Sequence, residues 1–213
     1  MRLYLSSYRL GNQPQELTKL LRGGRRAAVI ANAADAYPAD KRPEAVQHNL
    51  DELAGLGLEP TEVDLRDYFG KTQALEAKLR EFDLIYVRGG NCFVLRRAFK
   101  YSGADEVIAR LLKEDAVVYA GYSAGIDQLC LSLRGADLVD DPHNVPAGYQ
   151  TEIIWDGMGV VPYAIAPHYR SDHPESADIE KSVEYLIDHH IPFIALRDGQ
   201  AIVREGDRES VVG

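Results

Sequence analysis

Short, continuous runs of apolar residues alternate along this chain with longer segments whose apolar positions recur at helical spacing. This order predicts an α/β domain of three layers, a mostly parallel central sheet with helices on both faces. The expected strands are Leu3–Ser6, Ala27–Ala31, Thr61–Leu65, Asp83–Val87, Ala116–Ala120, Gly159–Ala166, Phe193–Leu196 and Ala201–Arg204. The expected helical segments are one with Val46, Leu50, Leu53 and Leu56 on one face, then Thr72–Phe82, Phe93–Leu112 and Ser176–His189.

Two of the expected strands run directly into glycine-rich turns. Asp83–Val87 leads into Arg88-Gly89-Gly90-Asn91, and Ala116–Ala120 leads into Gly121-Tyr122-Ser123-Ala124-Gly125. Ligands bind to open α/β sheets at the carboxyl ends of the strands. We therefore expect a site where these two turns meet.

The last two expected strands flank a short loop. Phe193–Leu196 and Ala201–Arg204 are separated by Arg197-Asp198-Gly199-Gln200. The glycine in this loop suits a tight turn.

Composition indicates one domain and excludes several classes of function. A chain of 213 residues with 46% hydrophobic content suits a single domain, residues 1–213. The 24 basic and 33 acidic residues give a net charge of -9, which repels nucleic acids and anionic membranes, so neither is expected as a partner. The N-terminus has no secretory pattern and no stretch reaches membrane-spanning length, so we expect a cytoplasmic protein, either a monomer or a homodimer.

The chain has two cysteines, Cys92 and Cys130. Their spacing matches neither a disulfide framework nor a zinc site, so we expect both to be small buried residues and expect no metal or organic cofactor.

The pentapeptide Gly121-Tyr122-Ser123-Ala124-Gly125 matches the pattern of a nucleophile turn. Glycine on either side of the serine lets a strand reverse into a helix without a side-chain collision, which exposes the serine hydroxyl at the edge of the sheet. The start of the helix adds backbone N–H groups that favour a developing oxyanion. The simpler alternative is a tight turn whose serine only caps the helix.

A serine nucleophile needs a general base from the same edge of the sheet. His168 fits best, because it follows an apolar strand and a proline that fixes the local chain. The other histidines are less suitably placed: His48, His189 and His190 fall in helical patterns, and His143 and His173 fall in polar loops.

The third member of a catalytic triad is a carboxylate that orients the imidazole. Asp198 is the first candidate because it follows an expected strand, and Asp137 is its competitor. An ordinary Asp-Gly turn is the simpler interpretation of Asp198.

A second donor to the oxyanion is expected from Gly89-Gly90-Asn91, with the N–H of Ala124 as its partner. The alternative is a phosphate-binding or purely structural turn, although a P-loop or GxGxxG pattern is absent.

Four stretches of the sequence together resemble the peptidase E (aspartyl dipeptidase) family of serine hydrolases. They are Tyr86–Asn91, Tyr119–Gly125, Val161–Tyr163 continuing to Pro167–Tyr169, and Leu196–Gly199. The resemblance implies a class I glutamine amidotransferase-like fold, with Ser123 as nucleophile and His168 as general base. It implies an oxyanion hole from the amides of Gly90 and Ala124, and it places Asp198 where the family has Glu.

The sequence departs from this family in two places. Asp198 is one methylene shorter than the usual Glu, so the loop must compensate or Asp137 must take the role. The family's Gly-Glu-Thr-Arg-Glu stretch is replaced by residues 174–180, which lack the arginine. Binding an aspartyl side chain would then need another cation, such as Arg88 or Arg170. The candidates for substrate binding are Arg88, Asn91 and Arg170.

The leading interpretation is a serine dipeptidase that cleaves Asp-X dipeptides through an acyl-enzyme on Ser123. Hydrolysis of another small amide, an ester or a cyanophycin-like acidic peptide is a related alternative. A non-catalytic member of the fold that binds a small molecule or a protein is the alternative from a different class, since fold alone does not confer chemistry.

Overall fold

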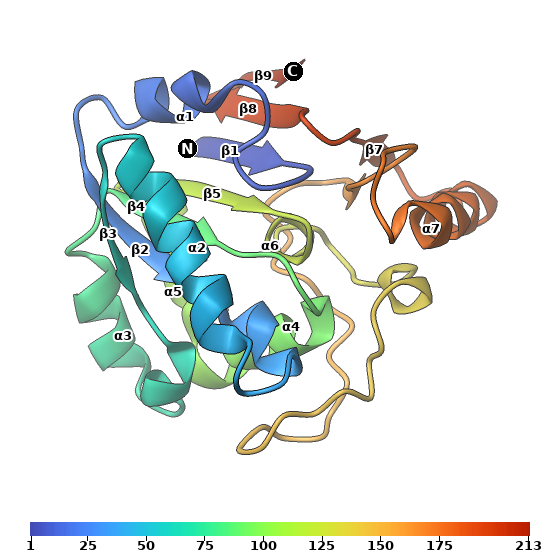
Figure 1. The fold of residues 1–213 in the computed structure, drawn as a ribbon, viewed down its shortest axis with the longest axis horizontal. Helices are drawn as coiled ribbons and strands as arrows, with labels where there is room; N and C mark the ends of the chain where they lie inside the picture. Colours follow the sequence, from blue (N-terminus) through green and yellow to red (C-terminus); the bar gives the residue numbers. More distant parts are fainter.

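A seven-stranded sheet forms the centre of the computed structural model, which describes all residues 1–213 (Figure 1). The strand order is β3-β2-β4-β5-β1-β8-β9. The first five strands in this order are parallel to their neighbours, whereas β8 and β9 continue the sheet in antiparallel pairs. Their bounds are β1 Arg2–Ser6, β2 Arg26–Ile30, β3 Glu59–Glu62, β4 Leu84–Val87, β5 Val118–Tyr122, β8 Ala201–Glu205 and β9 Arg208–Val212.

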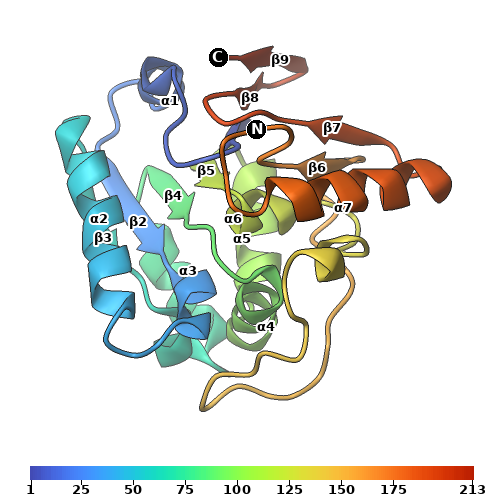
Figure 2. The same cartoon turned by 45° about the vertical axis from the view of Figure 1, so that its right-hand side comes forward.

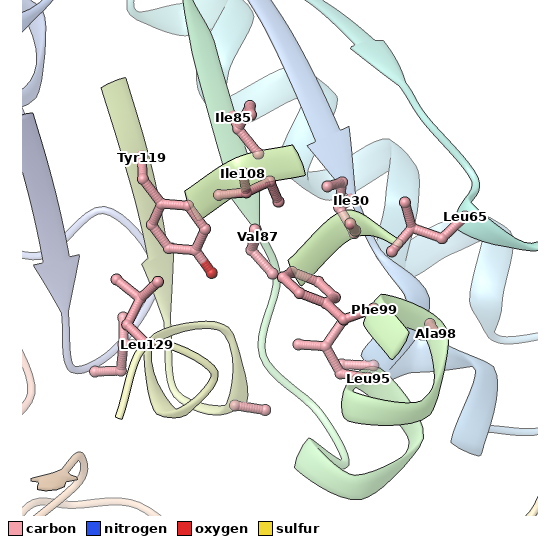
Figure 3. Close-up of a cluster of buried hydrophobic side chains, with 14 of the residues drawn as sticks. Ile30, Leu65, Ile85, Val87, Leu95, Ala98, Phe99, Ile108, Tyr119 and Leu129 are labelled. Carbon is pink, nitrogen blue, oxygen red and sulfur yellow. The ribbon is translucent and has the colours of Figure 1, made fainter. Parts of the chain in front are cut away.

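Helices cover both faces of the sheet, as the alternation of apolar runs and helical patterns predicts. Side chains alternate between faces along each strand. Leu84 and Tyr86 of β4 therefore pack under α1 (Pro14–Leu20) and α2 (Arg42–Gly55). The opposite face packs against α3 (Thr72–Leu79), α4 (Cys92–Ser102) and α5 (Ala104–Lys113). In Figure 3, Leu95 and Phe99 of α4 lie against Val87 in this second cluster.

A small βαβ unit lies beside the main sheet (Figure 2). Strands β6 (Ala164–Ala166) and β7 (Phe193–Ala195) are parallel and are connected through α7 (Ser176–Asp188). The expected tight turn between β7 and β8 is present: the backbone N–H of Gln200 donates to the carbonyl of Arg197 at 2.9 Å, and Gly199 has a φ of 94°. The two strands do not pair with each other. β8 pairs with β1, where Ala201 and Ile202 are buried on opposite faces of the main sheet.

Other sequence predictions need smaller corrections. The helical pattern from Phe93 to Leu112 is two helices that meet at Gly103, whose φ of 77° ends the first helix. The strand expected at Thr61–Leu65 lies earlier, and the 3₁₀ helix η2 (Leu65–Tyr68) occupies its end. The strand expected from Gly159 is formed only from Ala164. Neither α1 nor β9 was predicted, because α1 is short and β9 is an exposed edge strand.

Two adjacent arginines of α4 hold the long irregular segment that follows the nucleophile turn. The fully buried guanidinium of Arg97 donates hydrogen bonds to the backbone carbonyls of Pro142, Asn144 and Glu152 at 2.7, 3.2 and 2.8 Å. Arg96 donates to the carbonyl of Asp156 at 2.7 Å. Charged donors thus replace the regular backbone pairing that this segment lacks.

Both cysteines are buried and free, as expected. None of the helices is long and apolar enough to cross a lipid bilayer.

Candidate active site

Ser123 lies on a strained turn between β5 and the short helix α6 (Ala124–Asp127). Its φ of 50° and ψ of -127° are rare for a residue with a side chain. The flanking glycines are required by close packing, because a Cβ would lie 2.7 Å from the carbonyl oxygen of Val87 at Gly121 and 2.3 Å at Gly125. The end of β4 therefore fits directly against the turn that carries Ser123.

The Gly89-Gly90 turn approaches the serine from β4. A Cβ at Gly89 would lie 2.8 Å from the Cβ of Ser123, so only glycine fits there. Gly90 has a φ of 138° and lines the same cleft as Ser123. Ala124 is the first residue of α6, where a helix leaves its N–H groups without an intrahelical partner. The two expected oxyanion donors thus belong to turns that meet at Ser123.

His168 is paired with Asp198. Its Nδ1 lies 2.7 Å from Oδ1 of Asp198, and its side chain is 99% buried. Ser7, at the end of β1, joins the pair: it accepts a hydrogen bond from the backbone N–H of His168 and donates one to Asp198, both at 2.7 Å. The backbone N–H of Asp198 donates to Ser171 at 2.8 Å. These contacts fix the imidazole and leave its Nε2 available.

Asp137 does not take part in this network. It is exposed in the 3₁₀ helix η3 (Ala136–Leu138), where its carboxylate accepts a hydrogen bond from the N–H of Gly135 at 3.0 Å. Of the two candidate carboxylates, the structure brings only Asp198 to His168.

A single cleft contains the predicted nucleophile and the predicted base. Ser123 and His168 both line it, together with Gly89 and Gly90. The rest of its lining is Tyr8, Arg9, Tyr37, His48, Arg88, Tyr122, His173 and Glu175.

His173 stacks on the predicted base, a contact that the sequence did not indicate. The two imidazole rings lie 3.7 Å apart at an interplanar angle of 8°. Tyr8 meets both rings edge-on, with ring centres 5.7 Å from His168 and 5.3 Å from His173. His173 was assigned only to a polar loop because nothing in the local sequence shows that this loop folds back over His168.

Burial lowers the pKa of His168, and the nearby His173 imidazole lowers it further. The carboxylates of Asp198 and Glu175 act in the opposite direction because they stabilise the protonated ring. Burial outweighs them, so the neutral imidazole is favoured, which is the form that can accept a proton.

The side chains of His168, His173 and Glu175 have ligand atoms within 4.8 Å of one another, close enough to be considered as a metal site. The lone pairs of imidazole nitrogens lie in the ring plane. Because the two rings are stacked face to face, those lone pairs run in parallel and do not converge on one ion. This arrangement fits ring packing better than metal binding.

The three candidates for substrate binding lie in different places. Arg88 lines the cleft, with its guanidinium 5.4 Å from the centre of the Tyr37 ring and a buried Nε that has no partner. Arg170 lies outside the cleft: its side chain is 61% exposed and 3.8 Å from Glu180. Arg9, which the sequence did not suggest, lines the cleft because the loop after β1 reaches it.

Asn91 has a structural role. Its Oδ1 accepts hydrogen bonds from the N–H groups of Phe93 and Val94 at 3.0 and 2.9 Å, which caps α4. Its Nδ2 donates to the carbonyl of Asp141 at 3.0 Å. Since both ends of the buried amide are engaged within the protein, the expectation that Asn91 binds substrate is not supported.

Comparison with known proteins gives relatives of one kind. Peptidase E of Streptomyces coelicolor is 32% identical over 142 residues, which cover 64% of this chain and 55% of the relative. A Drosophila melanogaster protein named "Probable alpha-aspartyl dipeptidase" is 28% identical over 143 residues, covering 65% of this chain and 56% of the relative. The chain thus spans little more than half the length of these two relatives.

A provisionally named peptidase E protein from Listeria monocytogenes EGD-e has the same fold, with a TM-score of 0.80 and 23% identity over 99% of this chain and 97% of its own. The family model described as peptidase family S51 matches residues 6–212. The resemblance inferred from the four sequence stretches is therefore confirmed, and the chain belongs to peptidase family S51.

Proposed function

We propose that this chain is a serine peptidase that hydrolyses small peptides through an acyl-enzyme on Ser123. The observation that carries the proposal is the single cleft lined by Ser123 and by His168, whose Nδ1 is paired with Asp198. Membership of family S51 supports the same chemistry. A strained serine turn and a fixed, largely neutral imidazole are what nucleophilic attack on a carbonyl requires.

The reaction follows from these positions. The Ser123 hydroxyl oxygen attacks the carbonyl carbon of the peptide while Nε2 of His168 takes the hydroxyl proton. The N–H groups of Gly90 and Ala124 stabilise the oxyanion that forms. His168 then gives its proton to the departing amine, and a water activated by the same imidazole hydrolyses the acyl-enzyme.

Asp198 stabilises the imidazolium that forms in each step. Its Oδ1 accepts the Nδ1–H of His168, which selects the tautomer with Nε2 free. Ser7 donates to the same carboxylate oxygen and so keeps it in place. The structure thereby accommodates the shorter Asp in the position where the family has Glu.

We propose Asp-X dipeptides as the substrates. The name of the Drosophila melanogaster relative supports this choice. The cleft supplies two cations, Arg88 and Arg9, that can pair with an aspartyl side chain and with the carboxylate end of a dipeptide. Arg88 is the better placed for the side chain, because it precedes Gly89, which packs against Ser123.

A fluorophosphonate probe tests whether Ser123 is a nucleophile. We expect one equivalent of probe on the wild-type protein, located at Ser123 by mass spectrometry, and none on the variant Ser123→Ala. A folded wild-type protein that takes up no probe would favour a binding protein over a hydrolase.

Two matched substitutions test the assignment of the third carboxylate. Asp198→Asn removes the acceptor for Nδ1–H and should lower kcat by roughly 10³- to 10⁴-fold. Asp137→Asn changes an exposed carboxylate outside the cleft and should leave kcat within about twofold. The reverse order of effects, measured as release of amino acid from a dipeptide, would show that the triad is wrongly assigned.

A dipeptide panel tests the proposed specificity. The wild-type protein should cleave Asp-Leu faster than Ala-Leu or Glu-Leu. Arg88→Gln should lower kcat/KM for Asp-Leu by roughly 10- to 100-fold, with a smaller effect on Ala-Leu, because a charge-assisted hydrogen bond is lost. Arg170→Gln, which alters an arginine outside the cleft, is the control. Equal losses on all three dipeptides in Arg88→Gln would exclude a role for this arginine in selecting Asp.

The pH profile tests the environment of His168. Activity requires the neutral ring, so kcat/KM should fall as the pH drops through a midpoint below the ordinary histidine value of 6.5. His173→Phe keeps an aromatic ring on His168 but removes the imidazole that lowers the pKa of His168. The pH midpoint of kcat/KM should therefore be higher in this variant than in the wild-type protein. A lower midpoint would show that the stacked His173 ring does not lower the pKa of His168.

A further inference from the structure

Ser123 lines a second cavity that the proposed mechanism does not use. It is enclosed by α6, the segment 130–140, β6 and α7. Apolar side chains such as Val139, Ile165 and Ile179 form much of its wall. Three carboxyl groups, those of Asp127, Asp140 and Glu175, also line it, and we call it the acidic cavity.

Asp127 is the unusual member of this group. It is half-buried and lines the acidic cavity. Its carboxyl group has no hydrogen-bond partner or cation, whereas Asp140 accepts a hydrogen bond from the N–H of Cys92 at 2.8 Å. Arg134, also in the lining, places its guanidinium 5.0 Å from the centre of the Trp155 ring instead of on these carboxyl groups. The acidic cavity therefore contains an unpaired carboxyl group.

The charge balance favours a cationic ligand. Burial raises the pKa of Asp127 well above its usual range, and the neighbouring carboxyl groups of Asp140 and Glu175 raise it further. Burial likewise raises the pKa of Asp140 to about 6. A buried carboxylate without a partner is costly, so the protonated acid is favoured unless a cation accompanies it. A cation among the three groups would remove this cost and provide charge-assisted hydrogen bonds.

The distance from the nucleophile limits which cation can bind. Asp127 follows Ser123 by one helical turn, since its backbone N–H donates to the carbonyl of Ser123 at 3.3 Å. Side chains at this spacing are neighbours, with Cβ atoms about 5–6 Å apart. In a peptide, the α-amino nitrogen is only two bonds from the carbonyl carbon under attack, whereas a lysine ammonium is six bonds away. A carbonyl carbon about 3 Å from the Ser123 hydroxyl thus brings the α-amino group within reach of Asp127.

We infer that Asp127, in the acidic cavity, is the residue that binds the protonated α-amino group of the substrate. This inference rests on the proposed acyl transfer at Ser123. Ser123 then lies between two regions of opposite charge: the acidic cavity takes the amino end, and the cleft with Arg9 and Arg88 takes the carboxylate groups. Glu175 lines both and forms part of the boundary.

Paired substrates that differ only in the amino group test the inference. Asp-Leu is compared with succinyl-Leu, which is the same molecule without the α-amino group, by measuring released leucine. The wild-type protein should favour Asp-Leu by roughly 10- to 100-fold in kcat/KM. Asp127→Asn should bring this ratio close to one. Using the ratio within each variant cancels any general loss of activity.

Two further variants complete the experiment. Asp137→Asn makes the same chemical change on an exposed residue and should keep the wild-type ratio. Glu175→Gln changes a side chain that is 44% exposed and should reduce the ratio of kcat/KM for Asp-Leu to that for succinyl-Leu less than Asp127→Asn does. It serves as the test if Asp127→Asn does not fold. Ala-Leu and propanoyl-Leu form a second pair that does not depend on a preference for Asp.

Two outcomes would overturn the inference. One is an unchanged ratio in both Asp127→Asn and Glu175→Gln. The other is that the wild-type protein cleaves acetyl-Lys-Leu faster than acetyl-Leu-Leu and that Asp127→Asn abolishes this preference. That result would show that the acidic cavity binds a cationic side chain of the substrate. Fluorophosphonate labelling of the wild-type protein distinguishes these results from failure of the proposed function, because that probe has no amino group and reports on Ser123 alone.

Discussion

The close contact between the end of β4 and the turn that carries Ser123 is the constraint on which the site depends. The carbonyl of Val87 occupies the space that a side chain at Gly121 or Gly125 would need, and Gly89 leaves room for Ser123 itself. Three glycines thus let two neighbouring parallel strands end against one another. That packing maintains the strained backbone of Ser123, which an isolated turn would not keep. The expected oxyanion donors, Gly90 and Ala124, belong to the two turns that meet there.

The base is positioned from segments that are distant in sequence. Ser7 at the end of β1 bonds to the backbone of His168 and to Asp198, and Asp198 follows β7 in the small βαβ unit. His173 closes the arrangement by stacking on the imidazole. The small unit and the main sheet therefore each supply part of the proposed active site. A network of this kind fixes ring orientation and protonation together, because the same contacts that hold the ring also set its pKa.

Charge is divided around the nucleophile. Arginines line the cleft, whereas carboxyl groups line the acidic cavity, and Ser123 is common to both. A zwitterionic dipeptide likewise carries opposite charges at its two ends. The chain lacks the arginine that the resemblance would place after His168, and Arg88 lines the cleft next to the Gly89-Gly90 turn.

The sequence by itself determined the α/β class, most of the buried strands, the serine turn and the histidine at a strand end. These features are local: a run of apolar residues or a glycine-flanked serine has the same meaning wherever the rest of the chain lies. Only the tertiary structure decided between Asp198 and Asp137, excluded Asn91 and Arg170 from the cleft, and brought Arg9, His173 and Asp127 to the site. It also decided that β8 pairs with β1. Each of these outcomes depends on which segments pack together across the fold, and side-chain spacing along the chain carries no information about such long-range contacts.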